Sequence, residues 1–363
     1  MAPEVLNDVV SVTYEDSLDE LDSCQITLNN WDADQRDFKY LDPNGAGGRF
    51  KPGTGLELSI GYQDRGGLTP QLSGQIVSVA PDFPEQGQPT LEVRALNQLY
   101  RLHYREETEE FRKLTDTQIA RRLLDLIKQA PAARGAPPLD LDLETRPTNS
   151  QVEQQYEYLL MQNEFPILFM LRRARHNGYD LYIEETDSGP AKLHFHLPDS
   201  QGPMYELKWG QSLVSFRPEL STKDPVDRVE VRASNVRDGE AIVGEATWDD
   251  LDTPGLKKVA ELHGADAALA GSQLVIDDTP VESKQEADQK AKDHLTELAE
   301  QLVTASGTTV GLPGVRAGRA ERFTGLGPFS GLYRITASTH AIGEGGYTTR
   351  FDARMEEPEE ERG

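Results

Sequence analysis

Residues 72–79 read Leu-Ser-Gly-Gln-Ile-Val-Ser-Val, and a similar pattern returns at residues 329–336 as Phe-Ser-Gly-Leu-Tyr-Arg-Ile-Thr. Each copy is followed, after a loop that contains glycine, by a second strand-like segment, residues 91–95 in the first case and 347–353 in the second. Two interpretations stay open. Antiparallel hairpins resemble one another because strand patterns are weak signals. The second interpretation is a duplicated β domain with helical material inserted between the copies.

The segments around the first copy also read as β-strands. Residues 9–14, 23–28, 55–62 and 90–95 are rich in β-branched side chains or alternate between apolar and polar positions. Turn residues separate them at intervals of ten to fifteen positions. This pattern is typical of an antiparallel sandwich or barrel. Further strands are predicted at residues 179–183, 192–197 and 227–233.

Helical periodicity appears in three places. Thr115 and Gln118 fit a capping box at the start of a helix that ends near Pro131. A second helix is predicted from Glu164 to Asn177, capped by Asn163 and stopped by Gly178, and a third begins at the capping box of residues 283–286. Residues 131–150 are predicted to be an irregular connection, and the chain is expected to end in an acidic tail at residues 355–361.

Composition restricts the classes of function. The chain has 363 residues, of which 62 are Asp or Glu and 37 are Lys or Arg, so its net charge is −25. Such a charge disfavours binding to nucleic acid or to an anionic membrane surface. No apolar run approaches the roughly 18–20 residues that span a bilayer, and the first residues lack the pattern of a signal peptide. The single cysteine, Cys24, permits no internal disulfide and is predicted to be a core thiol in a protein that folds in a reducing cytoplasm.

The sequence contains no recognisable catalytic or cofactor constellation. A dinucleotide-binding glycine motif, a phosphate-binding loop and a nucleophile elbow are all missing from it. His194 and His196 share one face of a predicted strand and could hold a metal, but the interpretation we favour is a polar pair on the solvent side. The other histidines are isolated, and solvated or capping roles are expected for them. We therefore predict no catalytic residue, no metal and no cofactor.

Arg172, Arg173 and Arg175 form the one dense basic cluster. Cations near the C-terminus of a helix complement the helix dipole, which explains the cluster without a function. The alternative is a docking patch for an acidic surface, such as another copy of this chain.

Several segments, in order, resemble the late control D proteins of contractile-tailed phages and the hub portion of VgrG-type spike proteins. Gly61-Tyr62 followed by residues 72–76 is similar to the first-barrel signature of that family, and residues 169–179 are similar to its Phe-Leu-x-Arg-Leu-Ala helix. Residues 280–291 resemble the entry to its late helix. The most specific stretch comprises residues 311–318, 329–335, His340 and 346–349. The glycine and tyrosine positions that carry the signature are Gly61, Tyr62, Gly74, Gly314, Gly318, Gly331 and Tyr333.

Two positions depart from the family pattern. Arg173 stands where leucine is usual, and Pro166 lies in the first turn of the same helix, where proline is tolerated. In addition, VgrG chains continue into an oligosaccharide-binding-type domain and a β-helical spike, whereas this sequence ends at Gly363. The resemblance therefore implies a hub that needs a separate spike protein.

The resemblance implies an α+β, mainly β fold with two similar antiparallel β-barrel tube domains, inserted helical or mixed segments, and assembly into a ring-forming trimer. The expected domains are a first tube domain at residues 1–104, an α/β insert at 105–200, a second tube domain at 201–235 plus 305–355, an insert with a long helix at 236–304, and an acidic tail at 356–363.

The implied function is that of a baseplate hub without enzymatic activity. A homotrimer would adapt the threefold central spike to the sixfold tail tube, with spike, tube and other baseplate proteins as partners. It would be made in the cytoplasm of a bacterial host and would neither bind nucleic acid directly nor insert into a membrane. Acidic walls of the ring would repel DNA in transit. The alternatives are a carbohydrate-active β-protein that uses its acidic residues and a hexameric tail tube or adaptor component.

Overall fold

The structure of the chain is a computed structural model. It describes residues 3–41, 49–62, 67–103, 105–129, 139–145, 153, 155–198, 203–234, 240–251, 254–277, 281 and 283–359. The expected entry residues Pro280 and Glu282, Gly66 of a predicted turn, most of the predicted connection at 131–150 and the last four residues of the predicted tail lie outside the described residues.

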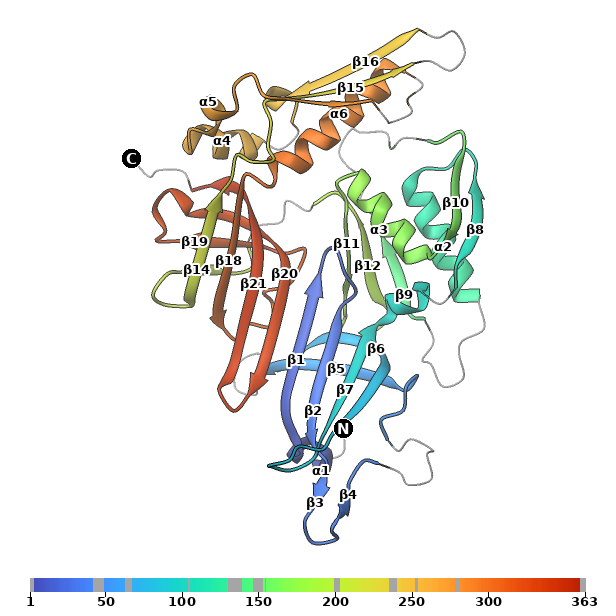
Figure 1. Cartoon of the computed structure of the whole chain (residues 1–363), viewed down its shortest axis with the longest axis vertical. Coiled ribbons are helices and arrows are strands. Elements are labelled where there is room, and N and C mark those ends of the chain that lie inside the picture. The colour runs from blue at the N-terminus through green and yellow to red at the C-terminus, as the bar shows by residue number, and fades with distance from the viewer. Residues whose placement is uncertain are drawn as a thin grey trace.

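One large sheet runs through the middle of the molecule (Figure 1). Its strands are, in sheet order, β14 (Leu213–Leu220), β18 (Val303–Val310), β21 (Gly346–Pro358), β20 (Gly331–Gly343), β1 (Val9–Ser17), β2 (Ser23–Asn29), β7 (Thr90–Asn97), β6 (Gly67–Asp82) and β5 (Gly55–Tyr62), with β19 (Ala320–Thr324) on β20 and β13 (Glu206–Lys208) on β19. All neighbours are antiparallel except β13 and β19. Because β21 runs to Pro358, the first part of the predicted acidic tail is strand.

The sheet consists of two units with the same strand order. Numbered along the chain within each unit, the order is first, second, fifth, fourth, third: β1-β2-β7-β6-β5 in one and β14-β18-β21-β20-β19 in the other. The bulges coincide as well. The first strand is interrupted between Val9 and Ser11 in one unit and between Leu213 and Ser215 in the other. The fourth strand is interrupted after Ile76 and after Ile335. The repeated sequence pattern therefore marks equivalent strands, β6 and β20.

The two units join edge to edge. The first half of β20 pairs with β19 and its second half pairs with β1, from Val12 opposite Ile342 to Ser17 opposite Ala337. The sheet stays open at β14 and β5, and no sheet built from the described residues closes into a barrel. The expectation of two closed barrels is therefore wrong. Strand β1 of the first unit pairs with β20 of the second unit, so neither unit closes on itself.

A first insert lies between the two units along the chain. It contains η1 (Gln98–His103), β8 (Glu107–Phe111), α2 (Asp116–Gln129), β9 (Leu141–Glu144), β10 (Leu159–Glu164), α3 (Pro166–His176), β11 (Asp180–Glu184) and β12 (Ala191–His196). Strands β11-β12-β9 form a small sheet and β10 pairs with β8. Both helices and these sheets bury one apolar cluster that includes Phe111, Leu123, Phe169 and Phe195.

A second insert interrupts the second unit after its first strand. It contains β15 (Arg228–Ser234), β16 (Ala241–Thr247), η2 (Trp248–Asp250), α4 (Pro254–Leu262), α5 (Ala265–Leu269), β17 (Gln273–Ile276) and α6 (Lys284–Ala299). Helix α6 buries Ala287, Ala291 and Leu295 against β15 and β16, whereas α4 packs on β21. The short elements are α1 (Pro3–Asn7), β3 (Trp31–Asp32), β4 (Asp37–Phe38) and η3 (Gly327–Phe329). No described helix is long and apolar enough to cross a bilayer.

Local capping explains where the helices begin. At α2 the Thr115 N–H donates to the Gln118 side chain at 3.1 Å and the Gln118 N–H donates to the Thr115 hydroxyl at 3.4 Å, so the predicted capping box is confirmed. Ser283 caps α6 as predicted, because its hydroxyl accepts from the Glu286 N–H. The predicted cap at Asn163 is wrong. Asn163 lies in β10 and bonds to Thr108, and α3 begins with Pro166 at its first position.

Candidate functional site: the polar face and the unit junction

The large sheet has one apolar buried face and one polar accessible face. Alternation along β7, β18 and β21 produces this division, as in any half-buried sheet. A row of directly paired residues crosses the accessible face from β14 to β1: Ser215, Thr308, Arg350, Thr339 and Glu15. The row continues across the unit junction without a break, so the two units present one common polar surface.

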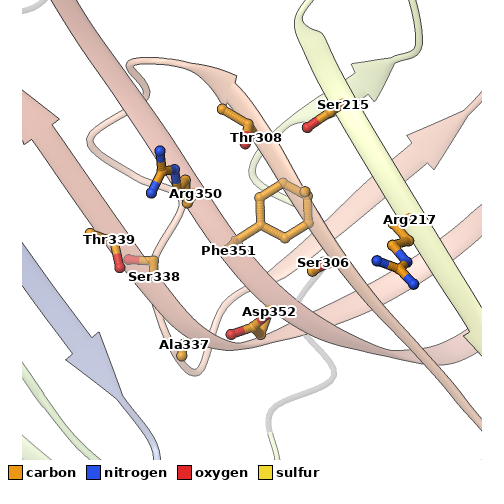
Figure 2. Close-up of a pocket in the computed structure, with 11 residues that line it drawn as sticks. Ser215, Arg217, Ser306, Thr308, Ala337, Ser338, Thr339, Arg350, Phe351 and Asp352 are labelled. Carbon is orange, nitrogen blue, oxygen red and sulfur yellow. The ribbon is translucent and has the colours of Figure 1, made fainter.

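This surface is hollowed over the second unit (Figure 2). The hollow has a volume of about 510 Å³, and Arg217, Arg350 and Asp352 line it together with serine and threonine hydroxyls. The ring of Phe351 lies opposite Gly307 on β18, where a Cβ would come within 2.4 Å of the ring. Because Gly307 has no side chain, the ring of Phe351 can pack directly against the backbone of β18.

The charges on the polar face are mixed. Arg94, Arg217 and Arg350 alternate with carboxylates such as Glu15 and Asp352. This face therefore has a mixed charge, although the whole chain carries −25, and the acidic ring wall expected from the sequence stays a prediction. Cross-strand neighbours of opposite sign stabilise a sheet, whereas like charges destabilise it, which favours such mixing.

A buried ionic network holds the two units together. Arg316, in the loop before β19, donates to the Asp16 carboxylate on β1 at 2.8 Å and also bonds to the Tyr14 hydroxyl. Asp22 lies 3.9 Å from the same guanidinium. Burial and the neighbouring Asp16 raise the pKa of Asp22 to about 7. One arginine of the second unit thus neutralises acidic groups of the first.

His340 belongs to the same junction. Its ring lies 3.1 Å from the Ser338 hydroxyl and 2.8 Å from the Tyr347 hydroxyl, and its exposed fraction is 0%. Burial lowers the pKa of His340 to about 4. The expectation that this isolated histidine is solvated or caps a helix is wrong, because it satisfies polar groups inside the junction.

The signature glycines and tyrosines lie where chain segments approach closely. The Tyr62 hydroxyl donates to the Gly311 carbonyl at 3.0 Å, and the Gln71 side chain donates to the Pro313 carbonyl at 3.1 Å, so residues 311–313 strap the second unit to the first. A Cβ at Gly74 would lie 1.9 Å from the Leu96 carbonyl oxygen. The remaining signature positions are distributed over both units and contact different partners: Gly61 opposite Leu68, Gly314 at Met204, Gly318 at Tyr182, Gly331 at Glu357, and Tyr333 in the second core. They do not form one site.

The histidine pair of β12 is buried, contrary to the solvent-side interpretation. His194 and His196 are 2% and 3% exposed, and the Nδ1 atom of His194 lies 3.0 Å from the Nε2 atom of His196. The second nitrogen of His194 lies 2.9 Å from the Glu184 carboxylate, which also bonds to Arg319 of the second unit. Hydrogen bonding to His194 lowers the pKa of Glu184 to about 2, even though burial opposes this shift. Among the described residues no group of three metal-ligating side chains is placed to hold a metal.

The three arginines of α3 do not form one surface. Arg173 is buried and donates to both oxygens of Asp116, at 2.6 and 2.8 Å. Arg172 and Arg175 are exposed and pair with Glu164 and Asp19. Arg173 is therefore unavailable for docking, while a docking role for the two exposed arginines stays a prediction. The core thiol at Cys24 is confirmed, and burial raises its pKa to about 12.

The junction residues Asp16, Asp22 and Arg316 were not identified from the sequence. Asp16 and Arg316 are 300 positions apart, and no local pattern links the two. The one available signal is Arg316 itself, which lies inside the most specific family-like stretch.

A family model described as "Alg8 N-terminal domain" matches residues 4–344. No curated protein matches the sequence.

Solved structures resemble the whole chain. The 43 kDa tail protein of prophage MuSo2 from Shewanella oneidensis superposes with a TM-score of 0.67 at 12% identity, over 96% of this chain and 94% of that one. A tail protein from Neisseria meningitidis MC58 follows with 0.63, 10% identity and coverages of 96% and 92%. The Escherichia coli c3393 protein, described as a component of the type VI secretion system, reaches 0.57 at 12% identity, over 98% of this chain and 74% of that one. The chain therefore has the fold of phage-type tail proteins.

Proposed function

The chain belongs to the Alg8 N-terminal domain family, and from its tail-protein fold we propose that it is a structural component of a contractile phage tail or of a related injection machine. Within that machine its role is that of a baseplate hub. It forms a homotrimer that connects a threefold central spike to a sixfold tail tube, and it works without catalysis.

The observation that carries the proposal is the duplication within the large sheet. Two units with one strand order and coincident bulges are fused through β1 and β20. Three chains then offer six like units in a ring, while the inserts repeat only three times. A component of this kind meets sixfold and threefold partners at once, which is how oligomer symmetry constrains an adaptor.

The partners follow from this arrangement. The ring of six units faces the tail tube protein, and a separate spike protein takes the threefold side, with other baseplate proteins on the inserts. The polar face, with its hydroxyls and mixed charges, suits a passage wall because charges of both signs lie on it and do not favour cargo of one charge. We place the protein in the assembled tail or injection particle.

Light scattering on the purified chain tests the proposal. We expect a particle of about 121 kDa, three times the chain mass of 40.3 kDa. We also expect this particle to bind the spike protein of the same tail. If the purified chain is a monomer at micromolar concentration and does not bind the spike protein, the proposal is overturned. A hexamer would identify a tube or adaptor component instead, and hydrolysis of polysaccharide would favour the enzyme alternative.

A further inference from the structure

Two of the strand edges that the large sheet leaves unpaired lie on strands other than β5. One is β14, whose outer side has no neighbour among the described strands. The other is the last part of β6, because β5 pairs with β6 only as far as Gln75 and leaves residues 78–82 open. Both edges expose apolar side chains, with Leu220 38% and Phe83 57% exposed. Open edges of this length invite strand addition.

The pairing of β1 with β20 inside the chain indicates which strand can pair with each open edge. Within the chain, the first strand of one unit, β1, pairs with the fourth strand of the other, β20, beyond its bulge. The two open edges are the same elements with the units exchanged: β14 is a first strand, and residues 78–82 are the part of a fourth strand that follows its bulge. The bulge of each first strand and the fourth-strand bulge nearest the junction set the correspondence, which differs by two residues from the alignment of the repeated sequence pattern. Ser11 corresponds to Ser215, and Ala337 corresponds to Ser78.

We propose that β14 of one copy pairs antiparallel with residues 78–83 of a second copy, in the register that β1 adopts on β20. The partner is another molecule of this same chain, bound head to tail. This inference rests on the proposed ring and names the surfaces that close it. A head-to-tail contact uses two different surfaces, and its repetition generates a ring when the rotation between neighbouring copies closes, as the proposed threefold arrangement requires.

The register brings complementary side chains together. Thr13 faces Ala341 inside the chain, and the equivalent pair between copies is Arg217 with Asp82. Both are exposed, and neither forms an ion pair with another described residue. In the same register Phe216 faces Phe83 and Leu220 faces Val79, so the pairing also covers the exposed side chains of Phe83 and Leu220.

One rung of the proposed pairing carries no hydrogen bond. The Ser221 N–H donates to the Leu302 carbonyl, so the backbone N–H and C=O groups of the odd-numbered residues of β14 point toward β18. The backbone of Pro218 therefore faces the open edge. In the proposed register Pro218 lies opposite Pro81, and neither has an N–H. The rungs on either side must hold the contact. Proline at an edge also limits indiscriminate strand addition before assembly.

Engineered disulfides test the register. The Leu18 N–H donates to Thr336, so the rungs with odd-numbered β1 residues are non-hydrogen-bonded, and so is the equivalent Arg217–Asp82 rung. Facing Cα atoms there lie about 4.5 Å apart, within the ~4.4–6.8 Å range of a disulfide. The native Cys24 is buried and contributes little background. Under oxidising conditions we expect R217C/D82C to link chains into species of up to three and no larger.

Three controls accompany that variant. T13C/A341C should give a disulfide within one chain, because those residues face each other inside it. S215C/D82C is shifted by two residues and should link poorly. The charge reversal R217D should weaken assembly at least about tenfold, and R217D/D82R should restore it.

The outcomes separate this inference from the proposed function. A wild-type trimer with no R217C/D82C link and no rescue by the double reversal overturns the pairing while the hub survives. A wild-type monomer overturns both. Links in R217C/D82C, few links in S215C/D82C and rescue by the reversed pair support the proposed register.

Discussion

Arg173 occupies a helix position where the family resemblance favours leucine, yet its side chain is buried. The charge is tolerated because Asp116 of α2 accepts two hydrogen bonds from it and the Tyr156 hydroxyl accepts a third. An isolated buried cation would be very costly, whereas a paired and hydrogen-bonded one is not. A position that reads as part of a basic patch in the sequence is therefore an internal link between α2 and α3.

Glu321 provides a prediction at this scale. Its carboxylate accepts the Tyr205 N–H at 2.6 Å, its other oxygen has no hydrogen-bond partner among the described residues, and burial raises its pKa to about 8. Because the pKa in the folded protein lies above its unfolded value, this group favours folding at low pH, and its contribution is lost as the pH rises from about 4.5 to 8. Glu321→Gln removes the dependence. Relative to wild type, we expect the variant to gain about 2–4 kcal/mol of unfolding free energy between pH 5 and pH 8.

Urea unfolding at the two pH values measures this change. The matched control is Glu206→Gln, because Glu206 lies exposed on the neighbouring strand β13. Its difference from wild type should be the same at both pH values. An equal effect of Glu321→Gln at pH 5 and pH 8 would contradict the prediction.

At the scale of elements, the repeated hairpins are long strands bent by bulges. In the second unit the fourth strand, β20, pairs with β19 before its bulge and with β1 beyond it. In the first unit the fourth strand, β6, pairs with β5 before its bulge and has an open edge beyond it. Local pattern identifies these strands, because alternation and glycine punctuation act over a few residues. The helix boundaries were predicted well where a side chain caps the first turn, as at Thr115, and wrongly where proline starts the helix without a side-chain cap, as at Pro166.

Gly74 tests how closely β6 must approach β7. Gly74→Ala places a Cβ against the Leu96 carbonyl, so the strands must separate or shift, and we expect a loss of about 1–3 kcal/mol of unfolding free energy. Gly345→Ala is the control, because nothing lies within 4 Å of its Cβ position in the turn between β20 and β21. It should change stability by less than about 0.5 kcal/mol. A Gly74→Ala protein as stable as Gly345→Ala would refute the steric argument.

At the scale of the whole molecule, the contacts between the two units fix the orientation of one unit relative to the other. Arg316 reaches from the second unit to Asp16 and Tyr14 of the first, and residues 311–313 reach Tyr62 and Gln71. These contacts make one continuous sheet out of two units and fix the orientation of its open edges. A ring built on those edges depends on this orientation.

Removing Arg316 should therefore destabilise the whole chain. Arg316→Ala leaves Asp16 buried without its cation, and we expect a loss of about 3–5 kcal/mol. Arg175→Ala breaks an exposed pair with Asp19, which also joins the insert to the first unit, and should cost at most about 1 kcal/mol. Denaturant unfolding of both variants measures the difference. Equal losses would show that the buried pair does not hold the units together.

The sequence by itself determined the mainly β character, the core role of Cys24 and the tail-protein resemblance, and it offered a duplication of the segments at 72–79 and 329–336 as one of two interpretations. These properties depend on local periodicity and on short motifs. Only the tertiary structure decided that the units share one open sheet instead of closing as barrels, that His194, His196, His340 and Arg173 are buried, and that Arg316 pairs with Asp16. The carboxylate partners of Arg173 and Arg316 lie 57 and 300 positions away, and no local pattern specifies which distant segment supplies them. The histidines bond mainly to near neighbours in the chain, but their burial depends on which elements pack over them, which no local pattern specifies.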